Sequence, residues 1–170
     1  MPRKAAGPVY VKTYSEGEIF LYGGERRALV RVGGRAAGER ARVSGGRLIV
    51  YGEAHDLKRF ITYWYAAETE KIARALVPAW SKKLRVRPLA ITVKYMRTRW
   101  GSCSSAGRIS LNLRLSMLSP DVAEYVIVHE LCHMKQMNHS DLFWNEVRSA
   151  LPEATTLRKK LRAEEREAVL

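Results

Sequence analysis

The chain has 170 residues, of which 46% are hydrophobic and 28% charged, and its formal net charge at pH 7 is +13. This length and composition fit one globular domain and exclude a disordered chain. The longest purely apolar runs, such as LIVY and YVIV, are far too short to cross a bilayer, so we expect no membrane partner.

The two cysteines, Cys103 and Cys132, do not suggest a disulfide framework. The N-terminal stretch begins with basic residues but lacks the apolar core of a signal peptide. We therefore expect a cytoplasmic protein with reduced thiols.

The positive charge is concentrated in residues 71–120, which contain 11 Lys and Arg side chains and no Asp or Glu. Such a segment can bind an acidic partner, such as a nucleic acid or an acidic peptide. It can equally be an Arg-rich solvated surface, and the sequence leaves both interpretations open.

The first fifty residues predict a small antiparallel β-unit. Short apolar or alternating runs occur at 9–14, 18–22, 27–32 and 47–51, and Gly-Gly pairs separate them. We place this unit at residues 1–53 and a second region at residues 54–170, both within one compact domain.

A helix and two strands are predicted next. Apolar residues repeat at helical spacing over 57–77, and Pro78 should end or kink that helix. Strands at 89–96 and 108–115 flank the Gly- and Ser-rich stretch 97–107, which predicts a hairpin with a long tip.

Helix signals return at Ser119, a good N-cap, followed by Pro120 at the first helical position. Asn138 can adopt the left-handed conformation that ends a helix. Two further helices are predicted, at 141–151 after the N-cap Ser140 and at 156–170, the latter as a charged, solvated helix.

Three of the four histidines lie within eleven residues of this region. His129 and His133 are four residues apart on the predicted helix, so they share one face and can bind one tetrahedral Zn²⁺. Glu130 flanks that face, where it can hold a zinc-bound water and accept its proton. This is the H-E-x-x-H arrangement of zinc peptidases.

A third ligand must follow the helix. His139 has the spacing of the third ligand in H-E-x-x-H-x-x-G-x-x-H enzymes, with Gln136 in place of the glycine. Glu146 is the alternative third ligand, because some zinc peptidases use a downstream Glu. Cys132 lies near the ligand face, but a fourth protein ligand would close the site to water, so we expect it to pack instead.

The segments RTRWGSCSSAGRISLNLRL and YVIVHELCHMKQMNHSDLFW closely resemble the YgjP-like metallopeptidases. These are small zincins distantly related to SprT-type proteases, which act on proteins crosslinked to DNA. The resemblance is dense from about Lys94 to Val147 and identifies the second region as catalytic. It implies an α+β, zincin-like minimal metallopeptidase domain with an N-terminal β-unit, a β-hairpin beside the active-site helix and C-terminal helices.

The resemblance also implies one zinc per chain, bound by His129, His133 and His139, with Glu130 as the general base. It marks further signature positions, which are Arg97, Arg99, Trp100, Gly101, Ser102, Cys103, Gly107 and Asn112.

Zincins usually bind substrate as an extra strand along a sheet edge, and we expect the strand at 108–115 to be that edge. The candidates for substrate binding or oxyanion stabilisation are Arg97, Arg99, Trp100 and Asn112, and a nearby Tyr could also donate to the oxyanion. Alternatively, Trp100 is a core residue and its loop is structural.

The leading hypothesis is a zinc-dependent metallopeptidase that hydrolyses peptide bonds of protein or peptide substrates, with a zinc-bound water activated by Glu130. One alternative is a DNA-associated protease acting on DNA-bound or crosslinked proteins, with nucleic acid docked on residues 71–120. Another is a nucleic-acid-binding module with structural zinc, in which Glu130 would have no role.

Overall fold

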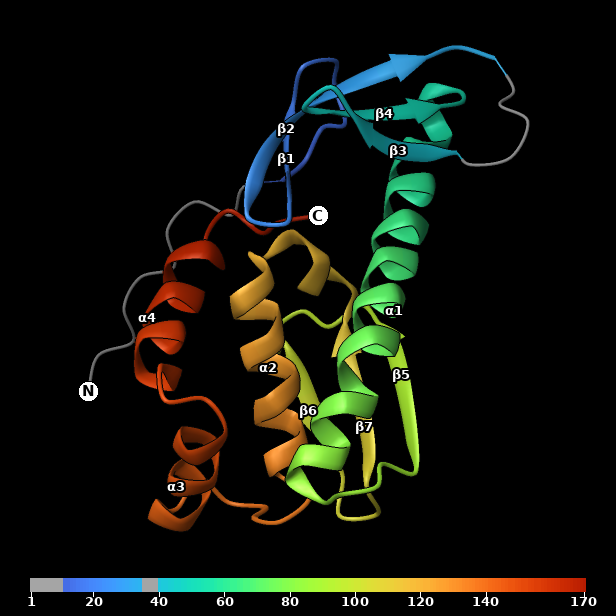
Figure 1. Cartoon of the computed structure of the whole chain (residues 1–170). Helices are drawn as coiled ribbons and strands as arrows, with labels where there is room; N and C mark the ends of the chain where they lie inside the picture. Colours follow the sequence, from blue (N-terminus) through green and yellow to red (C-terminus); the bar gives the residue numbers. More distant parts are fainter. Residues whose placement is uncertain (1–10, 35–39) are drawn as a thin grey trace, which may run out of the picture.

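The computed structural model describes residues 11–34 and 40–170, and within them the fold is α+β, as predicted (Figure 1). The N-terminal sheet consists of β1 (Ile19–Tyr22), β2 (Glu25–Val32), β3 (Ala41–Ser44) and β4 (Arg47–Tyr51). The central sheet consists of β5 (Ala90–Lys94), β6 (Gly101–Cys103) and β7 (Arg108–Asn112). The helices are α1 (Leu57–Leu84), α2 (Pro120–Cys132), α3 (Asp141–Ala150) and α4 (Ala154–Glu164), with short 3₁₀ turns η1 (Ala54–Asp56) and η2 (Leu113–Met117).

The N-terminal sheet is mixed, with strand order β1-β2-β4-β3. It contains two antiparallel hairpins, β1–β2 and β3–β4, and the parallel pairing of β2 with β4 joins them into one sheet. The expectation of a purely antiparallel unit was therefore wrong. Residues 11–14 of the first predicted strand form no strand, and residues 9 and 10 lie outside the described part. The unpredicted β3 has only four residues, too few for a clear alternation.

The N-terminal sheet docks on the rest of the molecule through the turn between β1 and β2. The backbone N–H groups of Gly23 and Gly24 donate to the carbonyl oxygens of Ser116 and Met117, both at 2.9 Å. Gly24 has φ +80°, and a Cβ there would lie 2.8 Å from Cβ of Ser119. The turn therefore touches the segment that leads into α2, and only glycine allows that approach.

The central sheet has the order β5-β7-β6. The two predicted strands pair in parallel rather than as a hairpin, and β6 forms within the predicted tip and pairs antiparallel with β7. The β6–β7 reversal is tight, because the N–H of Gly107, at φ +73°, donates to the Ser104 carbonyl at 2.9 Å. As a result β7 is central, and β6 is the edge strand that faces α2.

Helix α1 continues past Pro78 instead of ending there. Its second half remains apolar on one side, where Val77, Trp80 and Leu84 are buried. The indole Nε1 of Trp80 also donates to the Glu124 carboxylate of α2 at 2.7 Å. These tertiary contacts outweigh the local cost of the proline.

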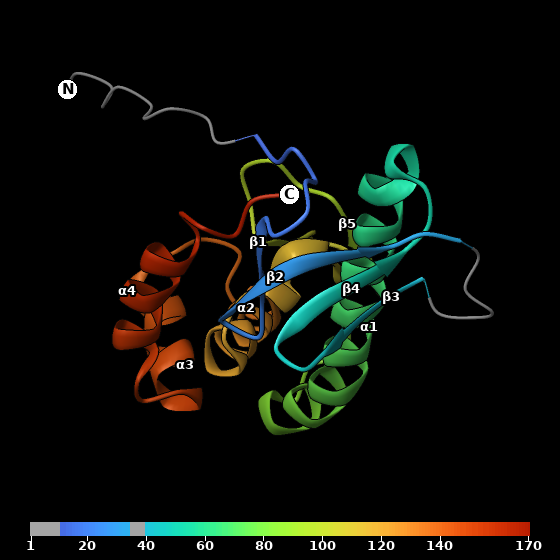
Figure 2. The ribbon, with the colours of Figure 1, turned by 90° about the horizontal axis from the view of Figure 1, so that it is seen from above.

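Helix α2 lies in the middle of the molecule and contacts α1, α3, α4 and β6 (Figures 1 and 2). It begins at Pro120 after Ser119, as predicted, but ends at Cys132 rather than near Asn138. Among the described residues only Tyr14 and Arg85 are non-glycine residues with positive φ, so Asn138 is not a left-handed cap. Helix α3 follows its predicted N-cap, Ser140.

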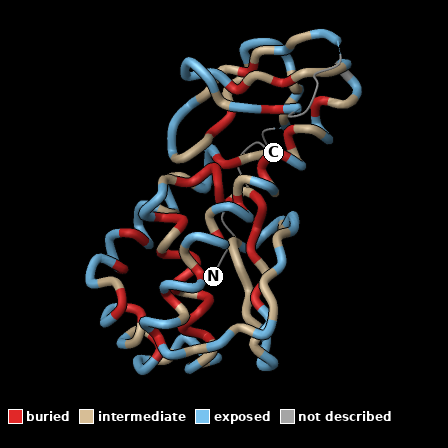
Figure 3. Tube along the Cα trace, turned by 45° about the vertical axis from the view of Figure 1, so that its right-hand side comes forward, coloured by how far each residue is buried: buried red, intermediate tan, exposed pale blue. Residues whose placement is uncertain are grey.

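Buried residues run through the centre of the molecule (Figure 3), and most of α2 belongs to this core. Ile127, Val128 and Leu131 of α2 are at most 1% exposed. The last turn of α2 is therefore fixed on a packed helix. No helix in the described ranges has the length and apolarity to cross a membrane.

Candidate metallopeptidase active site

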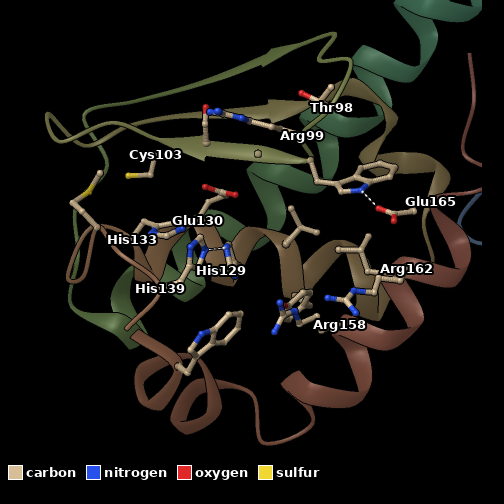
Figure 4. A pocket seen from close by; sticks show the side chains of 18 residues that line it. Thr98, Arg99, Cys103, His129, Glu130, His133, His139, Arg158, Arg162 and Glu165 are labelled. Carbon is tan, nitrogen blue, oxygen red and sulfur yellow. Dashed lines mark hydrogen bonds between the residues drawn. The ribbon is translucent and has the colours of Figure 1, made fainter. Parts of the chain in front are cut away.

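The three clustered histidines converge at the C-terminal end of α2 (Figure 4). His129 and His133 project from its last turn, and His139 lies in the connection to α3. One potential ligand nitrogen from each of these rings lies within 4.8 Å of the others. The Nε2 atoms of His129 and His139 are 3.1 Å apart. The structure thus brings together the three residues that the spacing singled out.

The backbone after α2 orients one of these rings. Nδ1 of His133 lies 3.1 Å from the carbonyl oxygen of Gln136. A carbonyl oxygen only accepts, so Nδ1 carries the proton and the Nε2 lone pair is left for a metal. Gln136 thus contributes through its main chain, which its side-chain identity does not reveal.

Helix α3 packs an aromatic side chain against all three imidazoles. The ring of Phe143 stacks on His133 with centroids 4.4 Å apart and lies edge-on to His129 and His139, both at 4.8 Å. Trp144 stacks on His139 at 5.7 Å. Neither aromatic was among the predicted site residues, because the only signal in the sequence is their position one turn after His139.

Burial disfavours the protonated form of the two imidazoles carried at the end of α2. Burial, followed by the neighbouring His133 and His139, lowers the pKa of His129 to about 3. Burial likewise lowers the pKa of His133. Neutral imidazole is the form that binds metal, so the lowered pKa values of His129 and His133 favour their use as metal ligands.

The other two candidate ligands lie outside this cluster. Glu146, the alternative third ligand, forms an ion pair with Lys135 at 2.7 Å. Cys132 is completely buried in the core, in agreement with a packing role.

Glu130 lies beside the histidines, between α2 and β6 (Figure 4). It is only 6% exposed, and its Oε2 atom has no hydrogen-bond partner among the described residues. Burial raises the pKa of Glu130 to about 7, against the opposing effect of the Arg99 charge. A Cβ on Gly101 would lie 2.5 Å from Cγ of Glu130, so this glycine leaves the space that the carboxylate occupies.

These residues form part of a cleft of about 860 Å³ between the β6 segment and the helices α2 and α4. Arg99, Trp100 and Cys103 line it, whereas Arg97 does not. The sequence analysis missed several lining residues, namely Tyr125, Met137, Trp144, Arg158, Leu161, Arg162 and Glu165. Helix α4, expected only as a solvated face, therefore forms one wall.

Two of the predicted contact residues have structural partners. Asn112 is fully buried, and its amide nitrogen donates to the carbonyl oxygens of Met96 and Arg99, both at 2.6 Å. Asn112 therefore holds the loop in place, and its amide nitrogen has no further hydrogen to donate to a substrate. The indole of Trp100 faces the cleft and donates to the Glu165 carboxylate at 3.3 Å, which links the two walls.

The expected substrate edge also differs from the observed one. The strand at 108–115 ends at Asn112 and is central, flanked by β5 and β6. The edge strand that borders the cleft is β6, which the sequence analysis had treated as loop.

Known proteins with a similar sequence or fold are metallopeptidases. The model of the YgjP-like metallopeptidase domain matches residues 5–164. Among solved structures, the crystal structure of the metallopeptidase zymogen of Pyrococcus abyssi abylysin has a TM-score of 0.51 and 21% sequence identity, over 58% of this chain and 99% of that one. No curated protein matches the sequence. The fold is therefore zincin-like, and the chain belongs to the YgjP-like metallopeptidase family.

Proposed function

We propose that this metallopeptidase is a zinc-dependent endopeptidase in which His129, His133 and His139 hold the ion and Glu130 is the general base. One observation carries the proposal. Three imidazole nitrogens within 4.8 Å of one another lie beside a buried carboxylate, in a cleft open to a peptide.

A zinc ion, when bound, would supply a Lewis acid that polarises the scissile carbonyl. Glu130 performs the proton transfers. With a pKa near 7, its carboxylate accepts a proton from the attacking water and returns it to the leaving amine. Its position between α2 and β6 excludes bulk water, which strengthens these interactions.

The substrate backbone would lie along the free edge of β6, with little demand on its sequence. Arg99 is the predicted donor that still fits oxyanion stabilisation, because it lines the cleft and its charge acts on Glu130. Tyr125, which also lines the cleft, is the alternative tyrosine donor.

The test compares wild type with Glu130→Gln and His133→Ala on an unfolded protein substrate, with fragments identified by mass spectrometry and bound zinc by elemental analysis. Glu130→Gln should keep one zinc per chain and lose about 10²–10⁴ of the cleavage rate, because only the proton acceptor is removed. His133→Ala should lose the metal. Full activity of Glu130→Gln would rule out the general-base assignment.

The DNA-associated alternatives rest on the acid-free segment 71–120. In the structure, several Lys and Arg side chains of this segment already have partners, so fewer remain for a nucleic acid. Lys71 pairs with Glu68 at 2.6 Å and Arg74 with Glu70 at 3.0 Å, while Arg114 donates to backbone carbonyls. Nucleic-acid binding through the remaining cations stays a prediction.

Salt dependence tests this prediction. If six phosphates are contacted, affinity for single-stranded DNA should fall by about 300-fold between 50 and 200 mM salt. Fluorescence anisotropy over a salt series measures the slope. Affinity that does not change with salt, or no binding, would exclude both DNA-associated functions.

A further inference from the structure

Helix α4 presents two arginines to the cleft. Arg158 and Arg162 are four residues apart, so they share one face of the helix, and both line the cleft. Figure 4 shows them pointing inward on the side of His129 opposite to Cys103. Another cation of α4, Lys160, lies outside the cleft lining.

These arginines differ from Lys160 in their partners. Lys160 is neutralised by Asp121 at 2.7 Å and by Glu164 at 3.9 Å. Within the described ranges no ion pair joins Arg158 or Arg162 to a carboxylate. Two like charges one turn apart repel each other, and an anion bound between them would relieve that repulsion.

One carboxylate just after α4 offsets this positive charge only in part. Glu165 also lines the cleft, but its carboxylate accepts the hydrogen bond from the Trp100 indole. With two arginines against this one carboxylate, the end of the cleft formed by α4 keeps a net positive charge, while Glu130 lies beside the histidines.

Arg158 is held in place beside the histidines. Its guanidinium carbon lies 4.7 Å from the ring centroid of Trp144, and that ring stacks on His139. A cation fixed on an aromatic ring loses little conformational freedom when it binds a ligand. Arg158 is thus preorganised beside the histidines, and Arg162 follows it one turn later on the same face.

We propose that Arg158 and Arg162 form a subsite for a carboxylate of the peptide substrate, so that the enzyme selects acidic peptides. The carboxylate belongs either to an Asp or Glu side chain near the cleaved bond or to the free C-terminus. Arginine suits this role because its planar guanidinium binds a carboxylate through two parallel hydrogen bonds. The inference rests on the proposed peptidase function, but its test does not require turnover.

The experiment measures peptide affinity of the zinc-loaded Glu130→Gln protein, which should bind without cleaving. Fluorescein-labelled peptides differ only in a single Glu or Gln, placed at each position in turn, and each has either a free or an amidated C-terminus. We expect about tenfold tighter binding of the carboxylate member of one such pair. Preference for Glu identifies the side chain, and preference for the free acid identifies the C-terminus.

Adding Arg158→Gln and Arg162→Gln should reduce that affinity ratio to about one, and Lys at both positions should restore part of it. The matched control, Lys159→Gln with Arg166→Gln, removes two exposed charges that do not line the cleft and should leave the ratio unchanged. Thermal unfolding by circular dichroism verifies that each variant is folded.

An unchanged ratio in the cleft variant, or an equal loss in the control, would overturn the proposal. So would loss of single-stranded DNA affinity at an unchanged ratio, which would assign the pair to nucleic acid. If the carboxylate preference is present but wild type cleaves none of these peptides, the subsite stands and the peptidase proposal fails.

Discussion

The Glu130 carboxylate occupies space that is free only because the neighbouring residue 101 is a glycine. Gly101, on the edge strand β6, faces α2, and a Cβ there would lie 2.5–2.7 Å from the Cγ, Cδ and Oε1 atoms of Glu130. Such distances are far inside van der Waals contact. The glycine therefore defines how close the edge strand comes to the proposed base.

We expect Gly101→Ala to reduce kcat by about a hundredfold, because a displacement of the base by about 1 Å misaligns proton transfer. Zinc content should not change, since the three atoms nearest to the added Cβ all belong to Glu130 and not to a histidine. The control is Gly33→Ala, at a position with ordinary φ and nothing within 4 Å. Steady-state kinetics and elemental analysis measure both effects, and a fully active Gly101→Ala would show that Glu130 tolerates the shift.

Residues of the site differed in how far the sequence could predict them. His129, Glu130 and His133 lie within one stretch of helix, so their shared face follows from local geometry. Phe143 and Arg158 reach the site only because α3 and α4 fold back on α2. No local pattern encodes that return, and α4 reads by itself as a charged surface helix.

The loop between β5 and β6 has no regular secondary structure. Side chains from β7 and η2 hold it in place. Asn112 binds the carbonyl oxygens of Met96 and Arg99, and the guanidinium of Arg114 donates to Met96 and Ala168. These bonds satisfy backbone groups that the loop itself cannot pair. They also fix the segment that carries three of the cleft residues, Thr98, Arg99 and Trp100.

Asn112→Ala should lower the free energy of unfolding by about 2–3 kcal/mol, because it removes two hydrogen bonds to loop carbonyl oxygens and the one that Asn112 accepts from the Arg114 N–H. The catalytic rate should fall as well, since Arg99 is no longer held. Urea titration gives the stability change. Asn145→Ala, which removes an exposed amide bonded to Arg148, is the control and should cost less than about 0.5 kcal/mol. Equal effects would contradict a loop-holding role.

Among the helices and strands, the length of an element decided whether the sequence could predict where it begins. The helices that begin at Pro120 and Asp141 carried cap signals and long apolar patterns, and they begin where predicted. Strand β6 has three residues and no detectable period, so its pairing with β7 was missed and a wrong hairpin resulted. The helix past Pro78 depends on contacts with α2 that lie outside any local window.

The N-terminal sheet and the catalytic region meet at the entrance to α2. The Gly23–Gly24 turn donates two backbone hydrogen bonds to η2, and the Tyr65 hydroxyl of α1 donates to the Leu21 carbonyl at 2.6 Å. The division at residues 53 and 54, within one compact domain, stays a prediction. These contacts favour joint unfolding of the two parts.

Gly24→Ala tests this coupling. The added Cβ would meet Ser119 at 2.8 Å, and overpacking of this kind costs about 1–3 kcal/mol of unfolding free energy. Gly23→Ala shares the turn and a positive φ but has nothing within 4 Å, so the difference between the two variants isolates the contact. Calorimetry should show one transition for both. Separate transitions for sheet and helices would argue for two independent units.

The contact between the Gly23–Gly24 turn and η2 has an evolutionary consequence. Because the turn contacts main-chain atoms of η2, the side chains of Ser116 and Met117 are not what it recognises. Those two side chains are instead buried against other residues, so the turn adds no constraint on them, whereas Gly24 has almost no accepted replacement. Within the family, we therefore expect this glycine to be kept where exposed positions of the N-terminal strands diverge, because the turn lies directly against the start of the helix that carries the histidines.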